Sequence, residues 1–174
     1  MEDISSLDKL QQQLQKPADQ LGEDGVLAIS TWRKHFIDSL LETTVGQQFP
    51  IIQKNGIVNV VKDGRLGCAL IVGIINRATM LGEDIPTYVD QLPDMLKASG
   101  WRLLPGTQPQ AFSDVIIWKK QNGHKHAGFY YGENRAVSMQ DHPDYPAKQE
   151  RSLRIHLMDY RPIEAVWTHP DLHG

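Results

Sequence analysis

Apolar side chains recur at helical spacing through the first hundred residues. The strongest pattern predicts a helix over residues 30–45, with Gly46 placed to end it. Similar patterns predict helices over residues 68–80 and 87–99, and Pro93 fits the last of these only if that helix starts late or is kinked. The polar face of the first helix is assigned to Arg33, Lys34, Asp38 and Glu42.

Beyond residue 114 the apolar positions change to strand patterns. The turn signals Asn122-Gly123 and Glu133-Asn134 join the first three predicted strands into antiparallel hairpins. Residues 101–110 contain two prolines and predict a loop. Helices followed by antiparallel strands indicate an α+β fold. The predicted strands are residues 115–118, 124–131, a third from 135, 153–157 and 163–167.

Two parts of the chain differ in composition. Residues 1–25 are polar and rich in glutamine, with leucines at helical spacing up to Pro17. We interpret them as an N-terminal helical extension, which could bind a partner protein or act as a tether. Residues 26–174 are long enough for one domain with a substantial core.

Composition and charge exclude several classes of function. The 174 residues are 40% hydrophobic and 22% charged, as in an ordinary soluble globular protein. A net charge of -3 and a pI near 6.1 argue against nucleic acid as the main partner. No apolar run approaches the roughly 18 residues of a membrane span. The N-terminus lacks the apolar core of a signal peptide, so we expect a cytoplasmic product unless a dedicated system exports or delivers it.

Cys68 is the only cysteine, which excludes an internal disulfide and a cysteine-rich zinc site. It is predicted in the first turn of a mostly buried helix, whose wetter side is Asn76 and Arg77. Unpaired backbone N–H groups and the positive end of the helix dipole favour a thiolate there, and Lys62 and Arg65 act in the same direction. The alternative interpretation is a small, inert, buried side chain.

His126 is the residue that bears on this choice. A thiol hydrolase needs a histidine that accepts the thiol proton and later donates it to the leaving amine. On the predicted strand, His124, His126 and Gly128 share one face, and the glycine keeps that face open. The alternative is two exposed histidines at the end of a hairpin.

The order of these elements resembles the NlpC-type (papain-like) cell-wall cysteine peptidases and amidases and their CHAP-amidase relatives. The matching segments are Gly67–Ala69 at a helix start, Gly100-Trp101 at a helix end, Ser113–Trp118, and His126–Gly132. The family usually has Gly-Asp and apolar residues at the third segment, and His-Val-Gly-Ile-Tyr-X-Gly at the fourth. The resemblance covers roughly residues 55 to 170 and implies a papain-like fold.

The resemblance also implies roles for individual residues. Cys68 matches the nucleophile, His126 the general base, and Asp114 a structural residue that bonds backbone near the strand start. The third catalytic residue departs from the family pattern of histidine, asparagine or an acidic residue. Our order of preference is Gln140, then Asp141, then Ser138. The expected activity is hydrolysis of an amide through a Cys68 thioester, with peptidoglycan stem peptides as substrate and without a cofactor.

Three other interpretations remain open. The domain could be a papain-like binding module without activity, or it could use the same pair for protein glutamine deamidation or another acyl transfer. Cys68, His124 and His126 could also bind zinc, although no further ligand lies at a telling spacing, and we expect no metal. The remaining histidines are interpreted as surface or satisfied residues: His35, His142, His156, His169 and His173.

Overall fold

The computed structural model describes residues 29–42, 51–53, 56–58, 67–141 and 151–173. Its α-helices are α2 (Ile29–Leu40), α3 (Gly67–Ala78) and α4 (Leu92–Ala98). The predicted extension, residues 1–25, lies outside the described residues. Among the described residues, none of the helices has the length and apolar character that crossing a bilayer requires.

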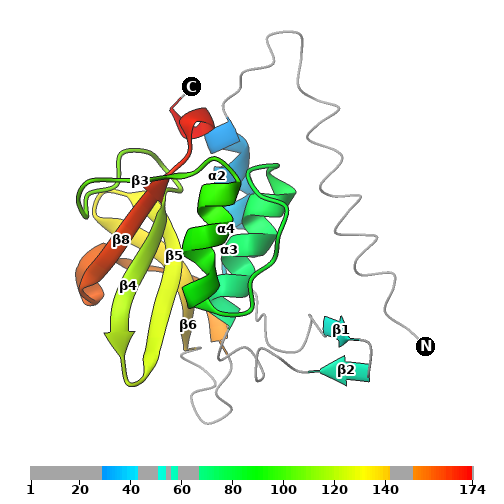
Figure 1. Ribbon diagram of the computed structural model, residues 1–174. Coiled ribbons are helices and arrows are strands. Elements are labelled where there is room, and N and C mark those ends of the chain that lie inside the picture. Colours follow the sequence, from blue (N-terminus) through cyan, green and yellow to red (C-terminus); the bar gives the residue numbers. More distant parts are fainter. Residues whose placement is uncertain (1–28, 43–50, 54–55, 59–66, 142–150, 174) are drawn as a thin grey trace, which may run out of the picture.

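A six-stranded antiparallel sheet forms the second layer (Figure 1), so the α+β class is confirmed. Its strand order is β3-β8-β4-β5-β6-β7, and α3 packs against β5 and β6. A separate two-stranded hairpin pairs β1 (Ile51–Gln53) with β2 (Gly56–Val58). The strands of the large sheet are β3 (Arg102–Leu103), β4 (Val115–Gln121), β5 (His124–Gly132), β6 (Arg135–Asp141), β7 (Arg151–Leu157) and β8 (Ile163–Thr168).

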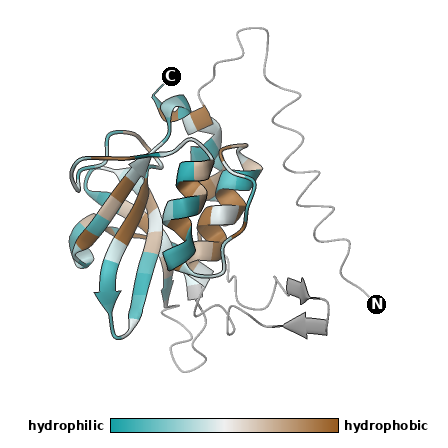
Figure 2. Cartoon of the chain, in the orientation of Figure 1, coloured by the Kyte–Doolittle hydropathy of each residue, from teal (hydrophilic) through white to brown (hydrophobic). Residues whose placement is uncertain are grey.

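Alternation along the strands divides the sheet into two buried faces. The face toward the helices carries the main core, to which Ile117, Phe129, Val137 and Leu153 belong. The opposite face carries a smaller cluster of Ile116, Trp118, Ala136 and Met158. Figure 2 shows α3 as mostly hydrophobic and the free end of the β4–β5 hairpin as hydrophilic. The short 3-10 helix η4 (Met158–Tyr160) contributes Met158 to the second face.

The predicted turns are confirmed by their backbone angles. Asn122 has φ of 51° and Gly123 of 86°, while Glu133 and Asn134 have 51° and 58°. Positive φ at both central residues gives the backbone twist that closes a two-residue hairpin. The late start of α4 is also confirmed, because the 3-10 helix η2 (Val89–Gln91) precedes it and Pro93 falls in its first turn.

Four details of the sequence analysis are wrong. Arg33 is fully buried instead of lying on the polar face of its helix, and Asn76 is buried with it. The helix α2 ends at Leu40, well before Gly46, because the chain turns at Glu42 with φ of 61°. The segment predicted as a loop over 101–110 contains β3, which pairs with the end of β8.

Candidate active site

Cys68 is the second residue of α3, as the sequence predicts, and only 6% of its surface is exposed. The first turn of α3 contains no acidic residue that would oppose a thiolate. The backbone N–H groups of a first turn have no acceptor within the helix. The helix start therefore favours negative charge on the sulfur and offers N–H donors beside it.

His126 lies on β5, the strand against which α3 packs, and is 5% exposed. Its neighbour Ala127 belongs to the same core cluster as Cys68, and the ring of His126 lies on the other face of the strand, beside Trp118. At His126 the register places β5 opposite Trp118 of β4, and the pairing of β5 with β6 begins at Gly128 opposite Ser138. The histidine therefore precedes the stretch in which β5 and β6 are joined.

Ser138 of β6 holds the ring of His126. The Oγ atom of Ser138 lies 2.9 Å from His126 Nε2, and Ser138 is fully buried. Gly128 makes this approach possible, because an added Cβ would lie 2.6 Å from Ser138 Cβ and closer still to the carbonyl oxygen of Val137. The close approach of Ser138 thus explains sterically why residue 128 is a glycine.

Ser138 also contacts a second histidine and an amide. His156 Nε2 lies 2.7 Å from Ser138 Oγ, and Gln140 Nε2 donates to the same oxygen at 2.8 Å. The other nitrogen of His156, Nδ1, lies 2.8 Å from the carbonyl oxygen of Leu157. Two imidazoles, one hydroxyl and one amide therefore form a continuous chain across β5, β6 and β7.

Aromatic rings enclose this chain. The ring of Trp118 lies 5.5 Å from the ring of His126 and 5.7 Å from that of His156. Trp118 is itself fixed, because its indole N–H donates to the carbonyl oxygen of Met158 at 2.8 Å. Tyr160 packs against the ring of His156 at 4.4 Å and edge-on to that of His126 at 6.3 Å.

Burial shifts the protonation of two of these groups. It lowers the pKa of His156, and the hydrogen bond to Leu157 opposes that shift only in part. Burial likewise raises the pKa of Tyr160, against hydrogen bonds with Gln140, Arg161 and Ser138 that lower it. His156 is therefore a neutral imidazole at neutral pH, and Tyr160 a neutral phenol.

The three candidates for the third catalytic residue occupy different places. Ser138, our last preference, is the one that contacts His126 Nε2. Gln140, our first, reaches Ser138 instead. Asp141 pairs through its backbone with Arg151, and its side chain lies outside the described part. The structural role expected for Asp114 is confirmed, because its Oδ2 accepts from the backbone N–H groups of Gln110 and Ala111 at 2.7 and 2.9 Å.

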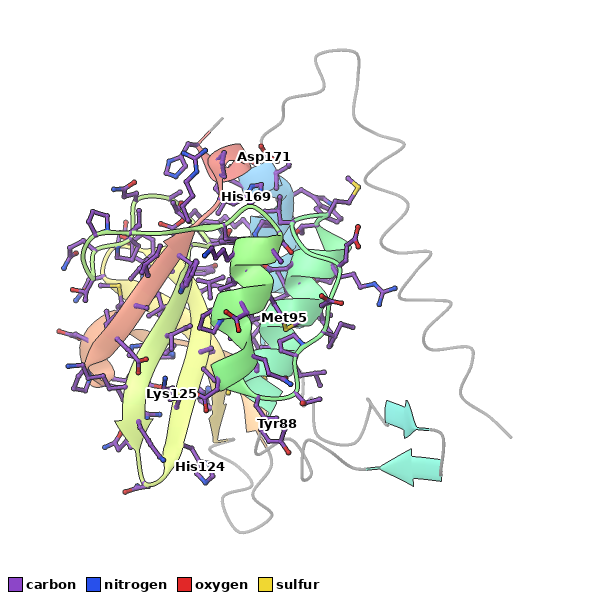
Figure 3. The ribbon with its side chains drawn as sticks, viewed as in Figure 1. Tyr88, Met95, His124, Lys125, His169 and Asp171 are labelled. Atoms are coloured by element: carbon purple, nitrogen blue, oxygen red, sulfur yellow. The ribbon has the colours of Figure 1, made fainter. Side chains whose placement is uncertain are left out.

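The zinc interpretation gains no support from the hairpin. Figure 3 shows His124 at the free end of the β4–β5 hairpin, where the side chain is exposed. The described residues contain no group of three or more His, Cys, Asp or Glu side chains arranged to hold a metal.

A cavity of about 400 Å³ lies on the helix-facing side of β4, and Lys125, the residue before His126, lines it. Its other walls include Val89, Leu103 and Trp167. Lys125 bonds Glu164 at 2.8 Å and Asp90 at 3.2 Å. The cavity is thus largely apolar, with an ion pair at one side.

His156 is the residue that the sequence analysis missed, because it was placed among the surface or satisfied histidines. Its position on β7 carries a signal, since Ser152, Arg154 and His156 alternate with the apolar Leu153, Ile155 and Leu157.

No family model matches the chain, and comparison with curated proteins finds no match.

Proposed function

We propose that this protein is a cysteine-dependent amide hydrolase with a papain-like arrangement of Cys68 and His126. The observation that carries the proposal is the contact of His126 Nε2 with the buried Ser138. It fixes the imidazole through one nitrogen, so Nδ1 is the nitrogen that can serve a thiol. Cys68 begins the helix that packs against the same strand.

The reaction follows from these residues. His126 Nδ1 takes the thiol proton as Cys68 Sγ bonds to the amide carbon. The oxyanion that forms accepts a hydrogen bond from the Cys68 backbone N–H at the helix start. The imidazolium then protonates the leaving amine as the C–N bond breaks, which leaves a thioester on Cys68. Water, deprotonated by the same imidazole, hydrolyses the thioester and restores the thiol.

Ser138 is not the nucleophile in this proposal. Its hydroxyl lies within hydrogen-bond reach of two imidazoles, as a serine hydrolase would require. However, its side chain is fully buried, whereas a nucleophile has to reach the substrate carbonyl. Ser138 instead orients His126, with Gln140 bonded behind it.

Peptidoglycan stem peptides are the substrate class that we propose, on the basis of the motif resemblance. Deamidation of protein glutamines would use the same two residues and the same thioester. The N-terminal 25 residues would then bind a partner or serve as a tether.

The first test is the pH dependence of thiol alkylation by iodoacetamide. A thiolate stabilised by the helix start and the imidazolium should give a midpoint below the free-cysteine value of about 8.5. His126→Ala should move the midpoint upward, and His124→Ala, on the exposed hairpin end, is the matched control. A wild-type midpoint at or above the free value would contradict an activated nucleophile.

The second test identifies the substrate. Purified peptidoglycan is assayed for new amines, and a panel of glutamine-containing proteins is assayed for released ammonia. Activity on the first alone supports the wall hydrolase, and activity on the second alone moves the function to deamidation. Inactivity on both, with partner binding unchanged in Cys68→Ala, would make the domain a binding module.

A further inference from the structure

The chain from His126 to Leu157 has a defined direction of hydrogen bonding. A backbone carbonyl only accepts, so His156 Nδ1 must carry the proton that bonds Leu157 O at 2.8 Å. In a neutral imidazole the other nitrogen is then a bare acceptor. His156 Nε2 therefore accepts from Ser138 Oγ at 2.7 Å, which takes the single proton of the hydroxyl in preference to the Tyr160 oxygen, the other acceptor beside it.

The direction continues from Ser138 to His126. With its proton directed to His156, the hydroxyl oxygen has only lone pairs for its other neighbours. Gln140 Nε2 donates to one of them at 2.8 Å. His126 Nε2, at 2.9 Å, must donate to the other, so the proton of neutral His126 lies on Nε2.

We propose that His156 is a positioning residue, which acts through Ser138 to keep the proton of neutral His126 on Nε2 and so leaves Nδ1 as the base for Cys68. The effect on Cys68 rests on the proposed function, whereas the direction of the hydrogen bonds from His126 to Leu157 does not. The lowered pKa of His156 supports it, because a protonated His156 would donate to Ser138 and reverse the chain.

The relevant alternative is a structural role, in which His156 only fills space beside Trp118 and Tyr160. A structural role depends on shape, whereas the positioning role depends on whether residue 156 accepts or donates a hydrogen bond. Two variants of comparable length separate them. His156→Glu, ionised, can only accept from Ser138, and His156→Lys can only donate to it.

The primary readout is the tautomer of each imidazole. Long-range proton–nitrogen NMR spectra of the full chain with ¹⁵N-labelled histidine, at about pH 8 where free imidazoles are neutral, show which ring nitrogen carries the proton. We expect Nδ1–H for His156 and Nε2–H for His126, assigned with the His126 and His156 variants. Since free histidine favours Nε2–H, the Nδ1–H form of His156 is the informative result, and Nε2–H there would overturn the proposal.

The variants give the second readout. In His156→Lys the proton of His126 should move to Nδ1, and Cys68 alkylation should slow by at least about tenfold, while His156→Glu keeps the wild-type tautomer and rate. In a Ser138→Ala background the two variants should no longer differ, because the hydroxyl that transmits the effect is gone. Equal behaviour of both variants with Ser138 present would contradict the proposal.

These results are distinguishable from failure of the proposed function. The wild-type tautomers do not require activity, and His156→Glu assigns the signals of His156 as well as His156→Lys does, so they decide the direction of the chain even if His156→Lys fails to fold. If the tautomers are as expected and neither peptidoglycan nor protein amides are cleaved, the positioning of His126 holds and the hydrolase proposal fails.

Discussion

Two polar clusters lie on opposite faces of the sheet, the first fully buried and the second half-buried at Gln140 and His156. The Arg33 cluster, on the helix side, joins Arg33 Nε to Ser113 Oγ at 2.7 Å, Nη1 to Thr79 Oγ1 at 2.6 Å and Nη2 to Asn76 Oδ1 at 3.1 Å. The His126 chain, on the other face, joins His126, Ser138, Gln140 and His156. Both connect segments distant in sequence, yet their chemistry differs.

The Arg33 cluster is a fixed charge among fixed acceptors. Burial lowers the pKa of Arg33 to about 9, with the charge of Asp114 opposing the shift, so the guanidinium is still protonated at neutral pH. The rings of Trp101 and Phe129 lie 5.5 and 5.1 Å from its central carbon and favour the cation. Such a cluster holds α2, α3 and the start of β4 together but has no proton to transfer at neutral pH.

The His126 chain consists instead of groups that can both donate and accept. Imidazole and hydroxyl can each reverse their roles, so the position of a proton in the chain depends on its partners. The contrast indicates that burial of polar groups alone does not mark a candidate active site. Groups that exchange donor and acceptor roles are the more informative feature.

The largest effect is expected at the reacting pair. Cys68→Ala and His126→Ala should each lower amide hydrolysis by about 10⁴-fold or more, because nucleophile and base act as one unit, and the double variant should lose no more than either. Cys68→Ala should reduce the free energy of unfolding by only about 1 kcal/mol. Amine release and urea unfolding check these outcomes, and His124→Ala should match the wild type in both.

Arg33→Ala should have the opposite effect, a large loss of stability with no change in the reactivity of Cys68. It leaves a cavity and removes the donor to Ser113, Thr79 and Asn76, so the free energy of unfolding should fall by about 3 kcal/mol. The alkylation rate of Cys68 in the folded fraction should stay at the wild-type value. Arg77→Ala, at an exposed position of α3, should change stability by less than about 0.5 kcal/mol. A loss below about 1 kcal/mol for Arg33→Ala would remove the distinction between the clusters.

Ser138→Ala should have the next largest effect, on the rate of hydrolysis. Loss of the hydroxyl releases His126 Nε2 and should lower hydrolysis about a hundredfold, whereas Gln140→Ala, one bond farther along, should cost only a few-fold. Asp141→Ala completes the comparison of the three candidates. Steady-state rates at saturating substrate distinguish them, and a larger loss in Gln140→Ala or Asp141→Ala than in Ser138→Ala would assign the orienting role differently.

The smallest effect is a dependence of stability on pH. Because burial lowers the pKa of His156 below 6.5, the unfolded chain binds its proton at a higher pH than the folded chain does. The contribution of His156 to stability is therefore complete above pH 6.5 and decreases as the pH falls toward the folded-state pKa. The free energy of unfolding is measured with urea at several pH values between about 5 and 8. It should rise less steeply with pH for His156→Phe than for the wild type. Equal slopes would contradict the expected shift.

Local signals were sufficient for much of the fold. Asn122-Gly123 and Glu133-Asn134 closed the two hairpins as predicted, because the required positive φ values are a property of the turn itself. The start of α3 at Gly67 likewise follows from the apolar spacing of its own residues. These elements depend on neighbours in the sequence, so a pattern of a few residues contains the information.

The misplaced residues depend on distant contacts. Arg33 looks like a polar-face residue until Ser113, 80 positions away, and Thr79 surround it. Ser113 itself takes φ of 65°, a conformation that glycine adopts freely, and the bond from Arg33 holds its hydroxyl there. His156 joins the candidate site only through the register of β6 with β7, which places Ala136 opposite His156 and Ser138 opposite Arg154. No local pattern fixes that register.

The position of β7 at the outer side of the sheet affects how often this strand opens. This strand is bonded along its length to β6, and on its other side the N–H of Glu42 donates to the carbonyl oxygen of Leu153 at 2.9 Å. Outer strands open more readily than central ones, so amide hydrogens of residues 154–157 should exchange with deuterium faster than those of residues 126–129. Each opening separates His156 from Ser138, so the exchange rate reports how often His126 loses its orienting partner. Equal protection of the two strands would mean that the contact with Glu42 is enough to keep β7 closed.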